Sequence, residues 1–491
     1  MNKTLKPSAA ALPLLLSLLA LAGCSLAPPY TAPHLAGPDV FKEAAPEAVS
    51  AAQWKTAAPA EALARGQWWT IFGDARLTAL ETEALEANQN VKAAAARLRQ
   101  ARSLTRSAQA EQAPQIGMGV GGLRQKSSAA SLGLPAGSAT PITTLWRAQA
   151  SASYEVDLFG RVASGVSVAQ ANAQQSEALF RSVLLALQAD VASVYFQVRE
   201  LDAEQALYAR TLELREDELT LVRKRFEAGD VSELDLAHAR TELAAAQAES
   251  QGIARQRANA EHALAVLLGK SPAEFDLPPT PLNRVELSIP AGLPSTLLER
   301  RPDIAAAERA MAAANARIGV AKAAFFPNLT LTGAAGFESA DLGDLLKWSS
   351  RNFLLGPLTG TVLSLPIFDG GRRQADLDRA RAAYEEEGAN YRQSVLVAFR
   401  EVEDNLAGLR ILGSQTQAQQ DAVSAAQRAA QLSLMQYREG LVSYHDVIDA
   451  DRSVLTHQRG LVQLDGERAR TVVGLIRALG GGWETPALAQ R

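Results

Sequence analysis

The sequence has few side chains that could do chemistry, and the most distinctive is its only cysteine, Cys24. This residue ends the run Leu21-Ala22-Gly23-Cys24, which follows an apolar stretch from Ala9 to Ala22. A short apolar run near a basic N-terminus is typical of a secretory signal peptide. The run itself resembles a bacterial lipobox, in which the cysteine thiol is lipidated before cleavage. We therefore expect a signal peptide over 1–23 and a mature chain held to a membrane by acyl chains, each buried methylene contributing about 0.8 kcal/mol.

The residue after the cysteine indicates whether the lipid anchor lies in the inner or the outer membrane. Ser25 stands there, where an aspartate would favour retention in the inner membrane, so the outer membrane is favoured. The alternative is an ordinary signal peptide with an incidental cysteine.

The other reactive side chains form no recognisable catalytic or metal-binding motif. The five histidines, at positions 34, 238, 262, 445 and 457, lack metal-ligand spacing, and one cysteine excludes an intrachain disulfide or a thiolate zinc cluster. Phosphate-loop, H-E-x-x-H, G-x-S-x-G and EF-hand patterns are missing from the sequence. With 49 basic and 53 acidic residues, the chain also lacks the charge expected of a nucleic-acid-binding protein. We predict no catalytic site, no cofactor and no resident metal.

Two glycine turns are followed by serines that can cap a helix. Gly229 precedes Ser232, and Gly440 precedes Ser443. Glycine commonly ends a helix in the left-handed conformation, and serine accepts hydrogen bonds from the first turn of the next helix. The sequence therefore predicts two helix–turn–helix tips, at 228–234 and 439–445.

A conspicuous charged motif is Arg300-Arg301-Pro302-Asp303. Pro302 suits the first turn of a helix, and Asp303 interacts favourably with the helix N-terminus. We interpret the motif as structural, with Arg300 and Arg301 pairing with a neighbouring helix or chain.

These features recur at a constant offset, which indicates an internal duplication. Pro114 and Pro327 are 213 residues apart, and the two glycine turns are 211 apart. We expect a first repeat over 77–269 and a second over 295–480. The remaining segments are an N-terminal linker or belt (24–76), a proline-rich linker (270–294) and a C-terminal tail (481–491).

Each repeat shows the same order of elements. A helix (77–112 and 295–325) ends at a proline, which cannot continue it. Two β segments follow, then a very long helix (160–227 and 371–438) and a return helix (232–268 and 442–479). A helix of roughly 68 residues spans about 100 Å, so it must pack along its length against other helices.

The β segments, expected at about 114–124, 144–157, 327–338 and 352–368, alternate in polarity. From Trp146 to Val156 the even positions are apolar, and the odd positions are polar. A strand with one face in lipid and the other in water has this pattern, although a half-buried soluble strand is an alternative. In lipid an open sheet edge is forbidden, so four strands would have to share a barrel with other chains. Two chains would give eight strands and three would give twelve; the small polar residues of one face favour twelve.

The motifs together resemble the outer-membrane efflux proteins, the TolC-like (NodT-type) lipoprotein channels of tripartite pumps. The resemblance rests on the lipobox, the duplication and four motifs: Leu297–Ile304, Phe325-Phe326-Pro327, Leu365–Arg372 and Tyr437–Arg452. It implies a mainly α-helical fold with a membrane β-barrel. Three chains would share a twelve-stranded barrel in the outer membrane and a periplasmic tunnel of twelve helices. A periplasmic adaptor and an inner-membrane pump would be the partners.

The resemblance also implies a periplasmic gate at the second tip, which we assign to Tyr444, His445, Asp446, Asp449 and Arg452. Asp449 and Arg452 match the Asp-Ala-x-Arg signature of the family, and three copies of Asp449 would form an acidic ring. A solvated helix face is the alternative. The family commonly has an apolar residue after Tyr444, whereas this chain has His445 and then Asp446. Because histidine titrates near pH ~6.5, we hypothesise a pH-sensitive gate.

The sequence leaves the cargo, the pump, the adaptor and the resting state open. A channel of a metal-ion efflux or type I secretion system remains an alternative. A lipid-anchored periplasmic coiled-coil scaffold is the alternative from another class.

Overall fold

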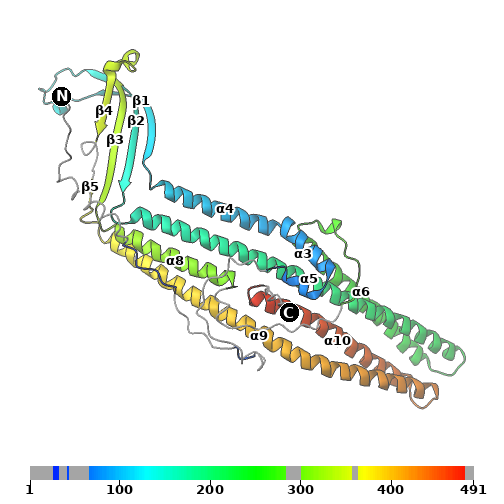
Figure 1. The fold of residues 1–491 in the computed structure, drawn as a ribbon. Coiled ribbons are helices and arrows are strands. Elements are labelled where there is room, and N and C mark those ends of the chain that lie inside the picture. Colours follow the sequence, from blue (N-terminus) through cyan, green and yellow to red (C-terminus); the bar gives the residue numbers. More distant parts are fainter. Residues whose placement is uncertain (1–25, 33–40, 44–65, 283–299, 356–362, 482–491) are drawn as a thin grey trace, which may run out of the picture. The chain divides into compact units, whose positions relative to one another are not determined.

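The computed structural model describes residues 26–32, 41–43, 66–282, 300–355 and 363–481 (Figure 1). Cys24 therefore lies outside the described residues, as do parts of the expected linkers, the fourth β segment and the tail. The chain divides into two compact units. Unit 1 comprises 1–34, 98–176 and 307–391, and unit 2 comprises 35–97, 177–306 and 392–491.

Unit 1 contains one antiparallel sheet built from both halves of the sequence. Its strands are β1 (Gln115–Lys126), β2 (Ile142–Val156), β3 (Asn328–Ser339), β4 (Arg351–Leu355) and β5 (Leu363–Ser364). The order is β1-β2-β3-β4, and β5 also pairs with β3. Within the β segment that the sequence predicted over 352–368, the structure describes β4 and β5, and 356–362 lie outside the described residues.

The register sorts the side chains of this sheet onto two different faces. Met118 lies opposite Ala150, which lies opposite Ala335, and residues directly opposite share a face. The apolar face carries Ile116, Met118, Val120, Trp146, Ala148, Ala150, Ala152, Tyr154, Leu331 and Phe337. The other carries Gly117, Gly119, Gly121, Arg147, Gln149, Ser151, Ser153, Glu155, Thr330, Thr332 and Glu338. On the polar face, Arg147 pairs with Glu338 at 2.7 Å.

The helices follow the two halves of the sequence in matching lengths. The first half has α3 (Ala75–Ala87), α4 (Gln89–Ala110), α5 (Arg161–Glu227) and α6 (Glu233–Leu267). The second has α8 (Pro302–Ala323), α9 (Arg372–Arg438) and α10 (Tyr444–Ala478). Helices α5 and α9 each have 67 residues, and α6 and α10 each have 35. A 67-residue helix is about 100 Å long.

The predicted single helix over 77–112 is wrong, because Asn88 separates α3 from α4. Its side-chain oxygen accepts hydrogen bonds from the N–H groups of Asn90 and Val91, at 2.8 and 3.1 Å. Its amide nitrogen donates to the carbonyl of Leu267 at 2.8 Å. Asparagine competes for backbone groups in this way, which favours a helix start over a helix interior.

The second half has a matching contact at the corresponding position. Arg301 precedes α8 as Asn88 precedes α4, and its Nη1 donates to the carbonyl of Ala478 at 3.0 Å. The offsets are 301 − 88 = 213 and 478 − 267 = 211, as in the sequence. Both halves thus attach the start of a short helix to the end of the return helix.

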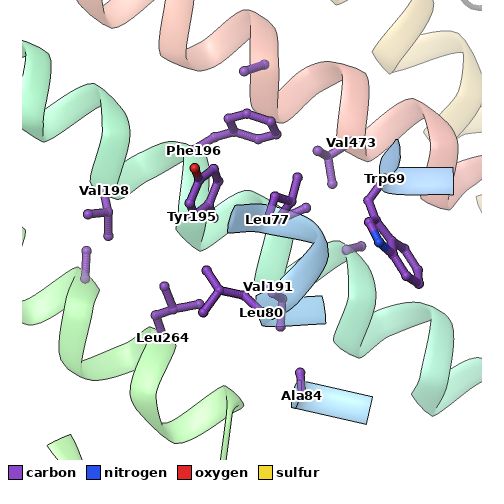
Figure 2. Close-up of a cluster of buried hydrophobic side chains, with 14 of the residues drawn as sticks. Trp69, Leu77, Leu80, Ala84, Val191, Tyr195, Phe196, Val198, Leu264 and Val473 are labelled. Carbon is purple, nitrogen blue, oxygen red and sulfur yellow. The ribbon is translucent and has the colours of Figure 1, made fainter. Parts of the chain in front are cut away.

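A large apolar cluster lies in unit 2 and joins six elements, including α4 through Val91 (Figure 2 shows part of it). The 3₁₀ turn η1 (Trp68–Phe72) contributes Trp69, and α3 contributes Leu77 and Leu80. These residues pack with side chains of α5, α6 and α10, including Tyr195, Leu264 and Val473. The segment before α4 therefore holds α5, α6 and α10 together within this unit.

Candidate functional site

The two helix–turn–helix tips of unit 2 have the same backbone design. Gly229 and Gly440 have φ values of +82° and +74°, in the left-handed region that glycine adopts without strain. Ser232 caps α6 and Ser443 caps α10, each in a reciprocal capping box with the aspartate three residues later.

Asp446 is the capping-box partner in the second tip. The N–H of Ser443 donates to Asp446 Oδ2 at 2.9 Å, and the Ser443 hydroxyl lies 2.6 Å from the same oxygen. These hydrogen bonds hold the pKa of the Asp446 carboxyl below its usual value. The structure thus gives Asp446 a local role in starting α10.

Tyr444 lies inside the tip within a single chain. It is 4% exposed, and its ring centroid is 5.5 Å from that of Tyr437 on α9. The apolar cluster around it, which we call the tip core, contains Leu219, Val222, Leu236, Ala239, Tyr437, Tyr444, Val447 and Ile448. Within one chain, Tyr444 packs α10 against α5, α6 and α9, and its place in a gate stays a prediction.

Three of the predicted gate residues lie together on the exposed side of α10. The side chains of His445, Asp449 and Arg452 are 63%, 58% and 56% exposed. His445 Nε2 lies 3.4 Å from Asp449 Oδ2, and Arg452 Nη1 lies 3.8 Å from Asp449 Oδ1. Exposed ion pairs of this kind stabilise by at most about 1 kcal/mol. Asp449 is thus an accessible acidic group with only weak partners.

Arg452 makes its strongest contact with α6. Its Nε and Nη2 donate to the two carboxylate oxygens of Glu242 at 3.1 and 2.5 Å, and this hydrogen bonding raises the pKa of Arg452. A bidentate arginine–carboxylate pair fixes geometry as well as charge. Arg452 therefore links the second tip to the first.

The sequence analysis missed His238 as a neighbour of His445. The two ring centroids are 6.1 Å apart, one on α6 and the other on α10. In the duplication His238 is the counterpart of Asp449, because 238 + 211 = 449. Both positions therefore lie about one turn inside their return helix, close to the tip.

A buried group of charges beside the tip core was also missed. We call it the α5–α10 charge cluster, consisting of Arg215, Glu218 and Asp451. Arg215 Nη1 lies 2.7 Å from Glu218 Oε2 and 3.2 Å from Asp451 Oδ2. The three side chains are only 4%, 10% and 14% exposed. Burial first, and then the hydrogen bond with Glu218, raise the pKa of Asp451 to about 7.

Helix α10 makes further ion pairs along its length, with its arginines facing glutamates. Arg459 pairs with Glu204 of α5 at 3.1 Å and with Glu249 of α6 at 2.7 Å. Arg470 forms a close pair with Glu200 of α5. At Asp451 the arrangement is reversed, because the acid belongs to α10 and its arginine partner, Arg215, belongs to α5.

The Arg300–Asp303 motif joins the start of α8 to two other helices within unit 2. Arg301 is 7% exposed, and its guanidinium contacts Asp303 and Glu401 of α9, both at 2.6 Å. The backbone of Arg300 packs on Gly480, where an added Cβ would lie 3.0 Å from the Arg300 carbonyl carbon. Pro302 is the first residue of α8. These contacts give the motif a structural role.

The strand-entry prolines and the segment after Cys24 belong to unit 1. Pro114 and Pro327 immediately precede β1 and β3. The carbonyl of Pro28 accepts from the Asn315 side chain at 2.8 Å, and the hydroxyl of Tyr30 lies 2.5 Å from Glu308 Oε1. The chain that follows the predicted lipidation site therefore lies along α8.

The described parts of the chain contain no set of side chains that could hold a metal ion. No group of three or more histidine, cysteine, aspartate or glutamate side chains lies close enough there to hold an ion. The exposed acids and arginines can instead act through charge and through contacts between helices.

Comparison with known proteins gives one consistent family. The model of the family "Outer membrane efflux protein" matches the chain twice, over residues 80–270 and 293–481. The outer membrane protein OprJ of Pseudomonas aeruginosa is 34% identical over 473 residues, covering 96% of this chain and 95% of OprJ. The cation efflux system protein CusC of Escherichia coli is 34% identical over 469 residues, covering 95% and 97% of the two chains.

A solved structure shows the same likeness in three dimensions. The MtrE outer membrane channel of Neisseria gonorrhoeae, determined in its open state, is 30% identical to this chain. It superposes with a TM-score of 0.78, covering 94% of this chain and 98% of MtrE.

Proposed function

The chain belongs to the outer membrane efflux protein family, and on that premise we propose that three copies of it form the exit duct of a tripartite efflux system. It is an outer-membrane protein that carries molecules delivered from the periplasmic side. The relatives OprJ and CusC are, by their names, an outer membrane protein and a cation efflux protein.

The two-faced sheet is the observation that carries the proposal. Ile116, Met118 and Val120 of β1 are 71–85% exposed and lie on the apolar face, while glycines of the same strand lie on the polar face. In water such an exposed apolar row would favour aggregation. In a membrane, lipid can cover this face while water wets the other. The sheet fits a wall between membrane and aqueous channel.

The sheet edges support the assembly of three chains. In the described residues, β1 pairs only with β2, so its other edge is free within one chain. A free edge exposes unpaired N–H and C=O groups, which a membrane does not tolerate. With the strand path of β4 and β5 taken as one, each chain brings four strands, and 4 × 3 = 12 closes a barrel wide enough for a channel.

The long helices and the tips suit a periplasmic tunnel with a narrow end. Helices α5 and α9 are each about 100 Å long, and each ends at one of the two tips. We place three copies of Asp449 around the axis as an acidic ring that attracts cations, with Arg452 fixing the spacing of α6 and α10. The lipidated Cys24 would hold each chain in the outer membrane.

The energy and the choice of cargo come from the partners in this proposal, namely a periplasmic adaptor and an inner-membrane pump. The antibiotic efflux pump outer membrane protein ArpC of Pseudomonas putida and the cation efflux protein CusC are 36% and 34% identical to this chain, so identity does not favour antibiotics over metal ions. A periplasmic scaffold would leave the exposed apolar face of the sheet without a role.

Conductance of the purified, lipidated protein in a planar bilayer tests the proposal, together with its migration in detergent gels with and without heating. We expect a heat-sensitive trimer and discrete conductance steps, and Asp449→Asn should reduce the preference for cations. Failure to insert, or migration as a monomer without heating, would overturn the trimeric channel.

A further inference from the structure

The α5–α10 charge cluster has an unusual balance for a buried site. With all three groups ionised, two carboxylates face one guanidinium and the cluster carries a net charge of −1. Removing a charge from water is costly unless a partner compensates it. One excess negative charge in this position therefore favours the uptake of a single proton.

The surroundings of the cluster come from all four helices of the tip. Tyr444 on α10 and Tyr437 on α9 are next to it, and their hydroxyls have no hydrogen-bond partner among the described residues. Glu242 of α6 adds a further negative charge near Arg215, but it is neutralised by its own pair with Arg452. The guanidinium of Arg225 on α5 lies over the Tyr437 ring at 4.9 Å. The tip core thus borders the cluster on one side, and Arg215 and Asp451 also line a pocket together with Leu214 and Leu455.

We propose that the α5–α10 charge cluster is a proton-operated latch, in which one proton shared by Asp451 and Glu218 fastens the start of α10 to α5. The proton comes from water, and no covalent bond changes. The protonated Asp451 donates a hydrogen bond to the Glu218 carboxylate, which keeps its pair with Arg215. Loss of the proton leaves two like charges facing each other across the helix contact and loosens the tip. The consequence for channel opening rests on the proposed function, whereas the latch itself does not.

The direction of the pH effect follows from the two states of Asp451. When the contact is open, the solvated carboxyl has its ordinary pKa of 3.8, whereas in the closed contact its pKa is about 7. The closed state therefore binds one more proton between these values, and it is favoured at acid pH. As the pH rises toward 7, the ratio of open to closed tips increases by at most about tenfold per pH unit.

His445 is less suited to this role. Its pair with Asp449 is more than half exposed, and solvent screens such pairs. We therefore place the proposed latch at the buried cluster, and the pH-sensitive gate at His445 stays a separate prediction.

Hydrogen exchange of the detergent-solubilised trimer, followed by mass spectrometry from pH 5 to 8, tests the latch without requiring conductance. After correction for the intrinsic exchange rate, protection of the segment 444–455 should fall several-fold as the pH rises. Asp451→Asn should remove this pH dependence and keep the protection found at acid pH. If Asp451→Asn does not fold, Glu218→Gln provides the second test. The control is Asp217→Asn, an exposed neighbour on α5, which should behave like the wild type.

Three results would overturn the latch: pH-independent protection in the wild type, unchanged pH dependence in both cluster variants, or loss of it in His445→Leu instead. A conducting channel with any of these results would leave the proposed function intact. A pH-dependent tip that fails to conduct would retain the latch and count against the channel.

Discussion

Glu81 offers a sharp test of the packing of unit 2. It lies on α3 between the core residues Leu77, Leu80 and Ala84, and it is 0% exposed (Figure 2 shows these neighbours). Neither carboxylate oxygen has a hydrogen-bond partner in the described structure. Burial raises the pKa of the Glu81 carboxyl from 4.5 to about 9, so the folded protein holds this group protonated at neutral pH.

The cost of that proton can be worked out from the two pKa values. Unfolding at pH 7 releases the proton, because the exposed carboxyl ionises above its ordinary pKa of 4.5. The native state therefore loses about 1.4 kcal/mol of stability per pH unit above 4.5, which amounts to about 3 kcal/mol at pH 7. This contribution is fully present below pH 4.5 and is lost as the pH rises through 9. Glu81→Gln keeps the size and the buried polar group but does not titrate, so it should stabilise by about 3 kcal/mol at pH 7 and little at pH 4.5.

Denaturant-induced unfolding of the detergent-solubilised protein, followed by circular dichroism at several pH values, would measure this. The matched control is Glu86→Gln, an exposed position on the same helix, which should leave the curve unchanged. Equal pH dependence in the wild type and in Glu81→Gln would refute the reasoning, as would a variant less stable than the wild type at pH 7.

Three further substitutions test other parts of the chain. Arg301→Ala should lower the free energy of unfolding by about 2 kcal/mol in the same denaturant-induced unfolding, since its guanidinium is buried but its acidic partners are partly exposed, and Arg300→Ala should lower it by less. Gly336→Ala would place a Cβ 2.2 Å from the Ala148 carbonyl oxygen, so the heat-sensitive oligomer should be lost on gels; Gly119→Ala meets open space and should retain it. Ser443→Ala removes the cap of α10 and should lower the free energy of unfolding by about 1 kcal/mol, with faster hydrogen exchange in its first turn.

Much of the fold could be predicted because its signals are local and periodic. The sequence placed the long helices at 160–227 and 371–438, and the structure has them at Arg161–Glu227 and Arg372–Arg438. A proline or glycine marks the ends of several helices. The alternation of polar and apolar residues over 144–157 identifies β2 from its own residues. Such signals depend little on what the chain packs against.

The errors occurred where a tertiary contact outweighs the local pattern. Asn88 ends α3 because the carbonyl of Leu267, 179 residues away, completes its hydrogen bonding. The burial of Tyr444 likewise depends on α5, α6 and α9 together, which its position in a motif does not reveal.

Asp451 was overlooked for a related reason, but a signal was available. It lies seven residues after Tyr444 and three after Ile448, on the stripe of α10 that faces the tip core. An acid on an apolar stripe at helical spacing requires a partner, although the sequence alone cannot identify Arg215 as that partner.

The distribution of charges along α10 limits how far a loosened tip could spread. Arg459 and Arg470 lie further along the helix, and both pair with acids of α5. Arg459 also faces two acids, but the Glu249 side chain is 47% exposed, so solvent screens that pair. Among the ion pairs that α10 makes in the described residues, the cluster at Asp451 is where two buried acids share one arginine, so the proton-sensitive contact is confined to the first two turns of α10. Loss of the shared proton would therefore release the start of α10, while the arginine pairs beyond it keep the rest of the helix on α5.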